Sequence, residues 1–381
     1  MSAPEVIADT PALETLCTAL RAAPILAVDT EFIREKTYFP QACLIQVATA
    51  EGAWAIDPLA PGIDLSPFFG LMDNPVIAWV FHAGRQDLEI LQLYARRLPA
   101  VIFDTQIAAQ FLGFGESVAY SDLVKQLLNV SLDKGMRFTD WQKRPLSPRQ
   151  IEYALADVIY LRQIHERMME QLNAVGRLSA AQEEMQALLE SAAATVEPEE
   201  AWRRIRHGTL KPAQLAALRA VAGWREREAL SRNVPRGHII KDDALLQIVA
   251  ACPKNEEELS HLRGMHSLSR GTRKAVVETV AAALASPPDT WPTPPRRAQT
   301  PPHVADTVQL LVSLLTLICS REHILPRLVA TREDLEAMVM GKRDVKLLHD
   351  WRYALFGRHA EAFLTGHLNL RYDPESKQIV F

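Results

Sequence analysis

The sequence predicts an α/β domain, a mixed sheet flanked by helices, followed by two all-α domains. Three observations support this fold class. Apolar runs of strand length end before residue 105. From Ser147 onward the chain has helical patterns and no convincing strand. Residues 286–303 contain seven prolines and predict an extended linker between two helical blocks.

The first domain is expected to alternate strands and helices. The run Ile25–Val28 is short, apolar and partly β-branched, which suits a buried strand. The two-residue gap Ala50-Glu51 between two later strands suits a tight hairpin. The predicted strands are 25–28, 42–49, 52–56, 76–81 and 101–103, and the predicted helices are 11–21, 86–97 and 105–112.

Helices are expected in the rest of the chain. Pro148, directly after Ser147, predicts a helix that reaches about residue 171. Helix-forming residues dominate 179–194, 211–284 and 306–370. Asp243–Val249 resembles Asp334–Val339, which indicates either an internal duplication or two bundles that are alike by chance. We expect domains at 1–201, 202–285 and 304–381, with the linker at 286–303.

Composition and charge narrow the class of protein. The 381 residues are 48% hydrophobic and 23% charged, as in a globular multidomain chain. We expect no membrane association, because no apolar run approaches the ~18–20 residues of a membrane span. The four dispersed cysteines suggest a reducing, cytoplasmic setting. Residues 1–201 carry a net charge of −12 and residues 202–381 of +8. This difference suggests that the first part gathers cations and the second part binds a polyanion, or that the two parts simply have different surfaces.

Four acidic residues are candidates for metal binding. Asp29 and Glu31 lie two residues apart on a predicted strand, so their side chains share one face. Tyr153 and Asp157 lie four residues apart on one face of a predicted helix. Asp87 begins another helix, where the helix dipole alone would favour an acid. Taken singly, each of these residues is also typical of a solvated strand end or of an ordinary helix surface.

Together these oxygen ligands would select Mg²⁺ or Mn²⁺ over Zn²⁺. Two such ions about 3.5–4 Å apart can clamp a phosphodiester during its hydrolysis, which requires several carboxylates from separate elements. The sequence contains no P-loop motif, so no nucleotide cofactor is expected. It also contains neither G-x-S-x-G nor H-E-x-x-H.

The segments around these residues resemble the DEDD 3′–5′ exonucleases, in their ribonuclease D form with a tyrosine in the third motif. The first helical block resembles the HRDC domain, and the second resembles a divergent copy of it. The segments that carry the exonuclease likeness are Val28–Pro40, Leu44–Val47, His82–Ile90 and Tyr153–Asp157, and those that carry the HRDC likeness are Ala229–Pro235 and Lys241–Asp243.

The resemblance implies an RNase H-like fold and hydrolysis of RNA from its 3′ end to nucleoside 5′-monophosphates. It implies one divalent ion at Asp29, Glu31 and Asp157, and a second at Asp29 with support from Asp87. Tyr153 would orient, or help to deprotonate, the attacking water. The expected substrates are tRNA precursors with 3′ extensions, and the expected state is a cytoplasmic monomer.

Further residues are candidates for contact with RNA. The rings of Phe32 and Tyr38 can stack on terminal bases or pack in a core. His82 can contact a phosphate or cap the helix that follows it. Basic residues in one loop and in the first helical block can meet the RNA backbone or stay solvated. These are Lys134, Arg137 and Arg144 in the loop, and Arg225 and Arg236 in the helical block.

Two other functions remain open from the sequence. One is a DNA 3′–5′ exonuclease of the same superfamily, since HRDC-like domains also occur in DNA helicases. The other is a non-catalytic RNA-binding protein. Crowded carboxylates repel a phosphate backbone, so the complete acidic set argues against the second.

Overall fold

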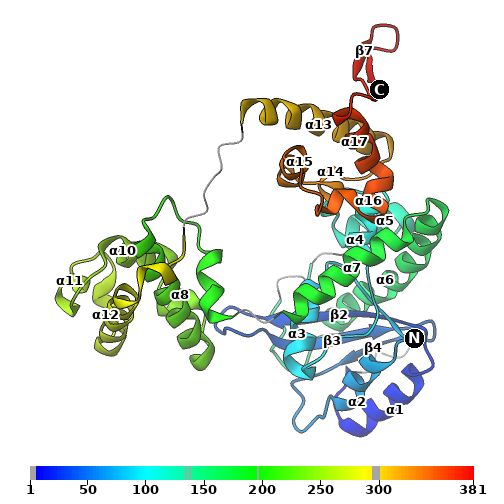
Figure 1. Ribbon diagram of the computed structural model, residues 1–381. Helices are drawn as coiled ribbons and strands as arrows, with labels where there is room; N and C mark the ends of the chain where they lie inside the picture. Colours follow the sequence, from blue (N-terminus) through cyan, green and yellow to red (C-terminus); the bar gives the residue numbers. More distant parts are fainter. Residues whose placement is uncertain (1–5, 134, 137–138, 195–196, 294–300) are drawn as a thin grey trace. The chain divides into compact units, whose positions relative to one another are not determined.

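The chain forms two units in the computed structural model, which describes residues 6–133, 135–136, 139–194, 197–293 and 301–381 (Figure 1). We call the first the sheet unit; it comprises Met1–Glu31, Ala42–Ala193 and Ala298–Phe381. We call the second the helical unit; it comprises Phe32–Gln41 and Ala194–Arg297. The chain therefore passes into the helical unit and back within its first 42 residues.

A six-stranded mixed sheet forms the centre of the sheet unit, as the sequence predicts. β2 pairs in parallel with β5, and β5 with β6, whereas β3 and β4 form the expected antiparallel hairpin. The short β1 pairs in parallel with β4 and was not predicted, because two residues carry no pattern. In sheet order the strands are β1 (Val6–Ile7), β4 (Ala53–Ile56), β3 (Gln41–Ala48), β2 (Ile25–Ile33), β5 (Ala78–Phe81) and β6 (Ile102–Asp104).

Helices flank the sheet, with α1 and α2 below it and α6 and α7 above it in Figure 1. α6 begins as expected: Ser147 caps it and Gln150 completes a capping box, with Pro148 in the first turn. This cap fixes the start of the helix that carries two candidate site residues. The helices are α1 (Thr10–Leu20), α2 (Ser66–Phe69), α3 (Arg85–Ala95), α4 (Thr105–Phe111), α5 (Tyr120–Leu128), α6 (Pro148–Ala174) and α7 (Leu178–Ala193), with a 3-10 turn at Gly70–Asp73.

The C-terminal helices belong to the sheet unit and share its hydrophobic core. The buried Arg352 fastens them to α7 through ion pairs with Glu183, at 2.6 Å, and Glu184. The expectation of no strand after Ser147 is wrong, because β7 and β8 form a hairpin too short for a readable pattern. The elements are α13 (Pro302–Arg321), α14 (Pro326–Val329), α15 (Arg332–Val339), α16 (Asp350–Arg352), α17 (Arg358–Leu364), β7 (Arg371–Asp373) and β8 (Gln378–Val380), with a 3-10 turn at Lys346–Leu348 and a π-helical turn at Tyr353–Gly357.

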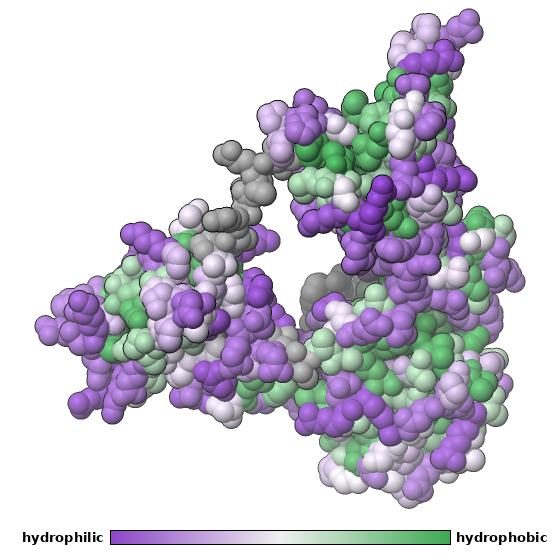
Figure 2. Space-filling model, in the orientation of Figure 1, coloured by the Kyte–Doolittle hydropathy of each residue, from purple (hydrophilic) through white to green (hydrophobic). Residues whose placement is uncertain are grey.

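α13 alone among the described helices is long and apolar enough to cross a membrane by length and composition. Its buried side chains, among them Val308, Leu311 and Leu314, lie in the core of the sheet unit. Figure 2 shows hydrophobic side chains gathered over α13, and Leu310 is among the exposed ones. One face of α13 is therefore packed against the core of the sheet unit.

The helical unit packs around Trp202, Leu218 and Val221. Its element order matches that of the C-terminal helices: a long helix that starts at a proline, a short helix, then a third. The duplication and the chance likeness of the two blocks both stay open. The elements are a 3-10 turn (Pro198–Arg204), α8 (Pro212–Arg232), α9 (Arg236–Ile239), α10 (Asp242–Ala251), α11 (Glu256–Ser260), a 3-10 turn (Met265–Ser267), α12 (Arg270–Ala285) and a 3-10 turn (Pro288–Thr290).

Candidate active site

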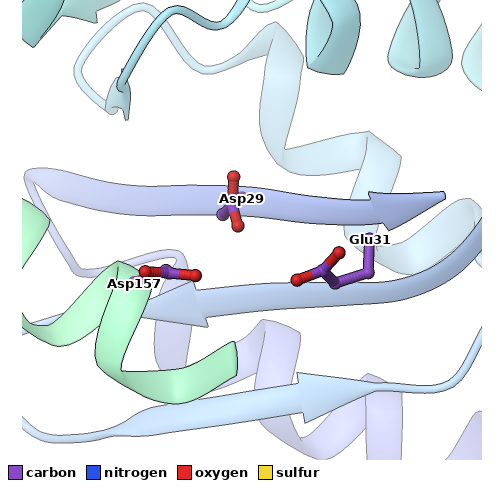
Figure 3. A group of neighbouring side chains, drawn as sticks. All are labelled: Asp29, Glu31 and Asp157. Atoms are coloured by element: carbon purple, nitrogen blue, oxygen red, sulfur yellow. The ribbon is translucent and has the colours of Figure 1, made fainter. Parts of the chain in front are cut away.

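Three carboxylates converge between β2 and α6. The buried residues before Asp29 anchor β2 in the sheet, and the period of two then directs Asp29 and Glu31 to the same face. Asp157 on α6 faces both of them (Figure 3). One oxygen atom from each of the three residues lies within 4.8 Å of the others. The convergence predicted for these residues is therefore present in the fold.

Desolvation and mutual repulsion dominate the electrostatics of this group. Burial raises the pKa of Asp157 to about 7. Burial, with repulsion from Asp157 and Asp87, raises the pKa of Glu31 to about 8. Burial, with repulsion from Asp87, Asp157 and Glu31, raises the pKa of Asp29 well above its usual range. Positive charge placed among these groups would relieve the repulsion.

Asp87 is buried in the first turn of α3. It accepts a hydrogen bond of 2.5 Å from Thr30, the strand residue between Asp29 and Glu31. Burial raises the pKa of Asp87 to about 6, and the Thr30 hydrogen bond opposes this rise. Asp87 is not one of the three residues whose oxygens meet, so its direct part in metal binding stays a prediction.

A tight turn places Asp87. Ala83 has a φ of 57°, and a Cβ on Gly84 would lie only 2.5 Å from the Cβ of Phe81, so a glycine is required there. Asp104, at the end of β6, accepts hydrogen bonds from the backbone N–H groups of Ala83, at 3.1 Å, and Gly84, at 2.8 Å. The carboxylate of Asp104 therefore holds the turn from which α3 starts.

A cavity of about 340 Å³ adjoins the carboxylates and is large enough for a nucleotide-sized group. Tyr153 lines it one helical turn before Asp157, with its ring centroid 6.3 Å from that of Trp141. Tyr120 also lines it and donates a hydrogen bond to the carbonyl of Ala156, at 3.2 Å. Burial raises the pKa of Tyr120 well above 10, so its hydroxyl keeps the proton that it donates.

The donor set fits hard divalent cations. Carboxylate oxygens are the ligands that Mg²⁺ and Mn²⁺ prefer, and the three meet from two different elements. Among the described residues, none of the ion pairs reaches Asp29, Glu31 or Asp157. A cation bound there would therefore meet no competing basic side chain from the described part of the chain at these three carboxylates.

The contacts of Tyr38 argue against the predicted stacking on RNA bases. Its hydroxyl donates to Glu226 on α8, and its ring packs against the core of the helical unit. Phe32 is partly buried, and no contact in the structure distinguishes its two predicted roles.

Arg144 also has a different role from the one predicted. Its guanidinium forms a bidentate ion pair with Asp57, at 2.6 and 2.7 Å, and donates to the carbonyls of Cys43, Trp141 and Lys143. All of its donors are therefore used within the protein, and we replace the predicted RNA contact with a structural role. The neighbouring candidates Lys134 and Arg137 lie outside the described residues.

In the helical unit the two arginine candidates differ. Arg225 is only 3% exposed and donates to the carbonyl of Ile240 and to Asp242, which favours a structural role. Arg236 is partly exposed and lies 3.7 Å from the buried Glu226. The contact of Arg236 with RNA stays a prediction.

His82 does not cap α3, and its contact with a phosphate stays a prediction. Nε2 lies 3.1 Å from the carbonyl of Val118 and Nδ1 lies 2.9 Å from the hydroxyl of Thr105. Burial lowers the pKa of His82. Its ring lines the cavity, but both nitrogens bind protein groups rather than the N-terminus of α3.

Sequence reasoning missed three residues that support the site: Thr30, Asp104 and Tyr120. Asp104 offered a signal, because an acid directly before a predicted helix is a typical N-cap. Thr30 and Tyr120 offered none, since their partners become neighbours only in the folded chain.

Comparisons with known proteins agree with this geometry. Residues 4–173 match the family model of a 3′-5′ exonuclease, and residues 214–271 match that of the HRDC domain. The HRDC match covers only the first of the two helical blocks, so the predicted duplication stays open. Ribonuclease D of Sphingobium indicum is 42% identical, with 95% of each chain aligned. Ribonuclease D of Gluconacetobacter diazotrophicus is 41% identical over 97% of this chain and 95% of the relative.

A solved structure supports the same family. The crystal structure of Escherichia coli RNase D matches with a TM-score of 0.83 and 32% identity, over 96% of this chain and 100% of the other. Neither the DNA exonuclease nor the non-catalytic alternative is favoured by these relatives. The chain belongs to the ribonuclease D family: it is a metal-dependent 3′–5′ exoribonuclease in which an RNase H-like domain precedes a helical HRDC domain.

Proposed function

We propose that this enzyme uses two divalent cations, Mg²⁺ or Mn²⁺, held by Asp29, Glu31 and Asp157 with Asp87 in support. The meeting of three carboxylate oxygens within 4.8 Å carries the proposal. Bound there, the cations would supply positive charge to the scissile phosphate and make the attacking water more acidic. We assign Asp29 to both ions, since repulsion from all three other acids contributes to its raised pKa.

The chain's own residues would position the reactants. Tyr153 lines the cavity beside Asp157, where its hydroxyl can orient the attacking water. We assign it orientation first and proton removal second, because an unperturbed phenol, with a pKa near ~10, is mostly protonated at neutral pH. Water attacks the terminal phosphorus, the bond from phosphorus to the 3′ oxygen breaks, and that oxygen leaves as the new 3′ hydroxyl. The product is a nucleoside 5′-monophosphate.

The natural substrates that we propose are tRNA precursors with 3′ extensions. The Escherichia coli relative is described as an exoribonuclease involved in structured RNA processing. The excess of basic residues after residue 201 suits a polyanion that extends beyond the cavity. We further propose that the enzyme acts as a cytoplasmic monomer without a nucleotide cofactor.

Matched substrates test this function. Purified enzyme is given a 3′-extended tRNA, an unstructured RNA and a DNA of the same sequence, with Mg²⁺, with Mn²⁺ or with a chelator. We expect release of nucleoside 5′-monophosphates from both RNAs, fastest from the tRNA, and none with chelator. Asp157→Asn should lower kcat at least a hundredfold, whereas Asp306→Asn, on the exposed side of α13, should leave it unchanged. Full activity in chelator, or a preference for DNA, would contradict the proposal.

A further inference from the structure

The loop between α4 and α5 borders the cavity beside the carboxylates. We call it the wall loop, and it comprises residues 112–119. Its last residue, Ala119, lines the cavity, and so does Tyr120, the first residue of α5. One side of the wall loop is held at the carbonyl of Val118, which lies 3.1 Å from Nε2 of His82.

The C-terminal helices hold the wall loop from another side, next to α4 and α5 (Figure 1). Arg327 on α14 forms an ion pair with Glu116, and its Nη2 donates to Oε1 of Gln110, at 3.4 Å. Nε2 of Gln110 in turn donates to the carbonyl of Glu116, at 3.1 Å. Because a guanidinium carries only donors, Arg327 also fixes which end of the Gln110 amide faces the loop. Arg327 therefore holds Glu116 twice, at its carboxylate directly and at its backbone through Gln110.

The start of the wall loop is attached to the same helices. Arg177, whose side chain is 18% exposed, donates to the carbonyl of Phe111, at 2.9 Å, and to that of Glu322, at 2.6 Å. It thereby joins the last residue of α4 to the C-cap of α13. Gly113 has a φ of 79°, and a Cβ there would lie 3.1 Å from the carbonyl oxygen of His323. The wall loop therefore packs closely against the end of α13.

The α6 side of the cavity has a separate support. The hydroxyl of Tyr120 donates to the carbonyl of Ala156, at 3.2 Å, and Asp157 follows on the same helix. This bond does not involve the C-terminal helices. A displacement of the wall loop therefore changes the width of the cavity and leaves Asp157 in place.

We propose that the C-terminal helices set the width of the cavity that receives the 3′-terminal nucleotide, with Arg327 as the positioning residue through which they act. The proposal rests on the proposed function, because the cavity must take the end of an RNA. It gives the C-terminal helices a task in substrate binding that requires no contact between them and RNA.

A trinucleotide RNA tests this role, because it is too short to reach distant RNA-binding surfaces. The full-length enzyme and its variants are assayed with Mg²⁺ on the trinucleotide and on a long 3′-tailed RNA. Arg327→Ala should raise the KM of the trinucleotide about fivefold and lower kcat less than about twofold. Its melting temperature should fall by less than about 2 °C, since an exposed ion pair adds little stability.

Arg332→Ala is the matched control. Arg332 lies on α15 and pairs with Glu336, and 49% of its side chain is exposed, compared with 50% for Arg327. This variant removes the same type of ion pair from the same group of helices without touching the wall loop. It should leave KM and kcat unchanged on both substrates.

A second variant covers the case in which Arg327→Ala folds poorly. Glu116→Ala removes the partner on the loop and should raise the KM of the trinucleotide about threefold. The double variant should have a KM no higher than that of Arg327→Ala, because both changes remove one pair. The affinity for a nucleoside 5′-monophosphate, measured by calorimetry with Mg²⁺, should fall by the same factor as the KM rises.

An unchanged KM of the trinucleotide in both single variants would overturn the proposal. A rise in KM that is confined to the long RNA would also overturn it, because Arg327 would then bind RNA directly. An inactive wild-type enzyme would refute the proposed function, and this inference with it.

Discussion

Asp157→Asn should stabilise the metal-free enzyme while it abolishes activity. Burial raises the pKa of Asp157 from 3.8 to about 7, so its ionisation costs about 4 kcal/mol more in the folded chain than in the unfolded chain at pH 8. Water in the adjoining cavity screens part of this cost, so we expect about 2 kcal/mol. For a unit of this size that corresponds to a melting temperature about 2–4 °C higher.

The pH dependence has a definite sign. A group whose pKa is higher in the folded state contributes stability below its unfolded pKa and loses that contribution as the pH rises through the folded value. The advantage of Asp157→Asn should thus be absent near pH 4, grow up to about pH 7, and stay constant above it.

Differential scanning calorimetry in chelator at pH 4, 6 and 8 measures this effect. Asp306→Asn serves as the control, because Asp306 is exposed and distant in sequence from the acidic group. With Mg²⁺ added, the order should reverse, since the wild-type enzyme binds the ion more tightly and gains more stability. A lower melting temperature for metal-free Asp157→Asn at pH 8 would refute the reasoning that crowded charge destabilises the empty site.

Three further predictions concern separate parts of the sheet unit. Arg144→Ala leaves the buried Asp57 unpaired, so it should lower the free energy of unfolding in urea by about 3 kcal/mol while RNA affinity stays unchanged. Arg144→Lys should not restore the lost stability. Burial lowers the pKa of His165 to about 4, so the free energy of unfolding should fall as the pH drops below 6.5. At pH 5 the wild-type enzyme should lose about 2 kcal/mol of this free energy, and His165→Gln should keep it. Equal losses in the two proteins would refute this prediction. Tyr153→Phe should lower kcat but leave Mn²⁺ affinity, measured by calorimetry, nearly unchanged; equal loss of both would remove Tyr153 from its assigned role.

The core of the site was predictable because its residues follow local periodicities. Asp29 and Glu31 share a face on any strand, and Tyr153 and Asp157 share a face on any helix. The apolar run before Asp29 and the cap at Ser147 then define the two elements. The resemblance to ribonuclease D supplied what periodicity cannot, namely that this strand and this helix face each other.

Long-range partners could not be predicted in the same way. Arg144 lies in a polar loop whose sequence does not indicate that Asp57, 87 residues earlier, would take its guanidinium. Tyr38 stands among residues of the first exonuclease motif, yet its partner Glu226 lies in the helical unit. An arginine or a tyrosine can donate a hydrogen bond to RNA as well as to a carboxylate of the protein. Only the fold therefore decides which of these partners the side chain has.

The central claim is that Asp29, Glu31 and Asp157 meet in order to hold divalent ions. Crystals of the enzyme soaked in Mn²⁺ and measured at the manganese absorption edge test it most directly. We predict anomalous density in contact with carboxylate oxygens of all three residues, and its disappearance in Asp157→Asn crystals. Density bound elsewhere, with these three carboxylates left without an ion, would contradict the account.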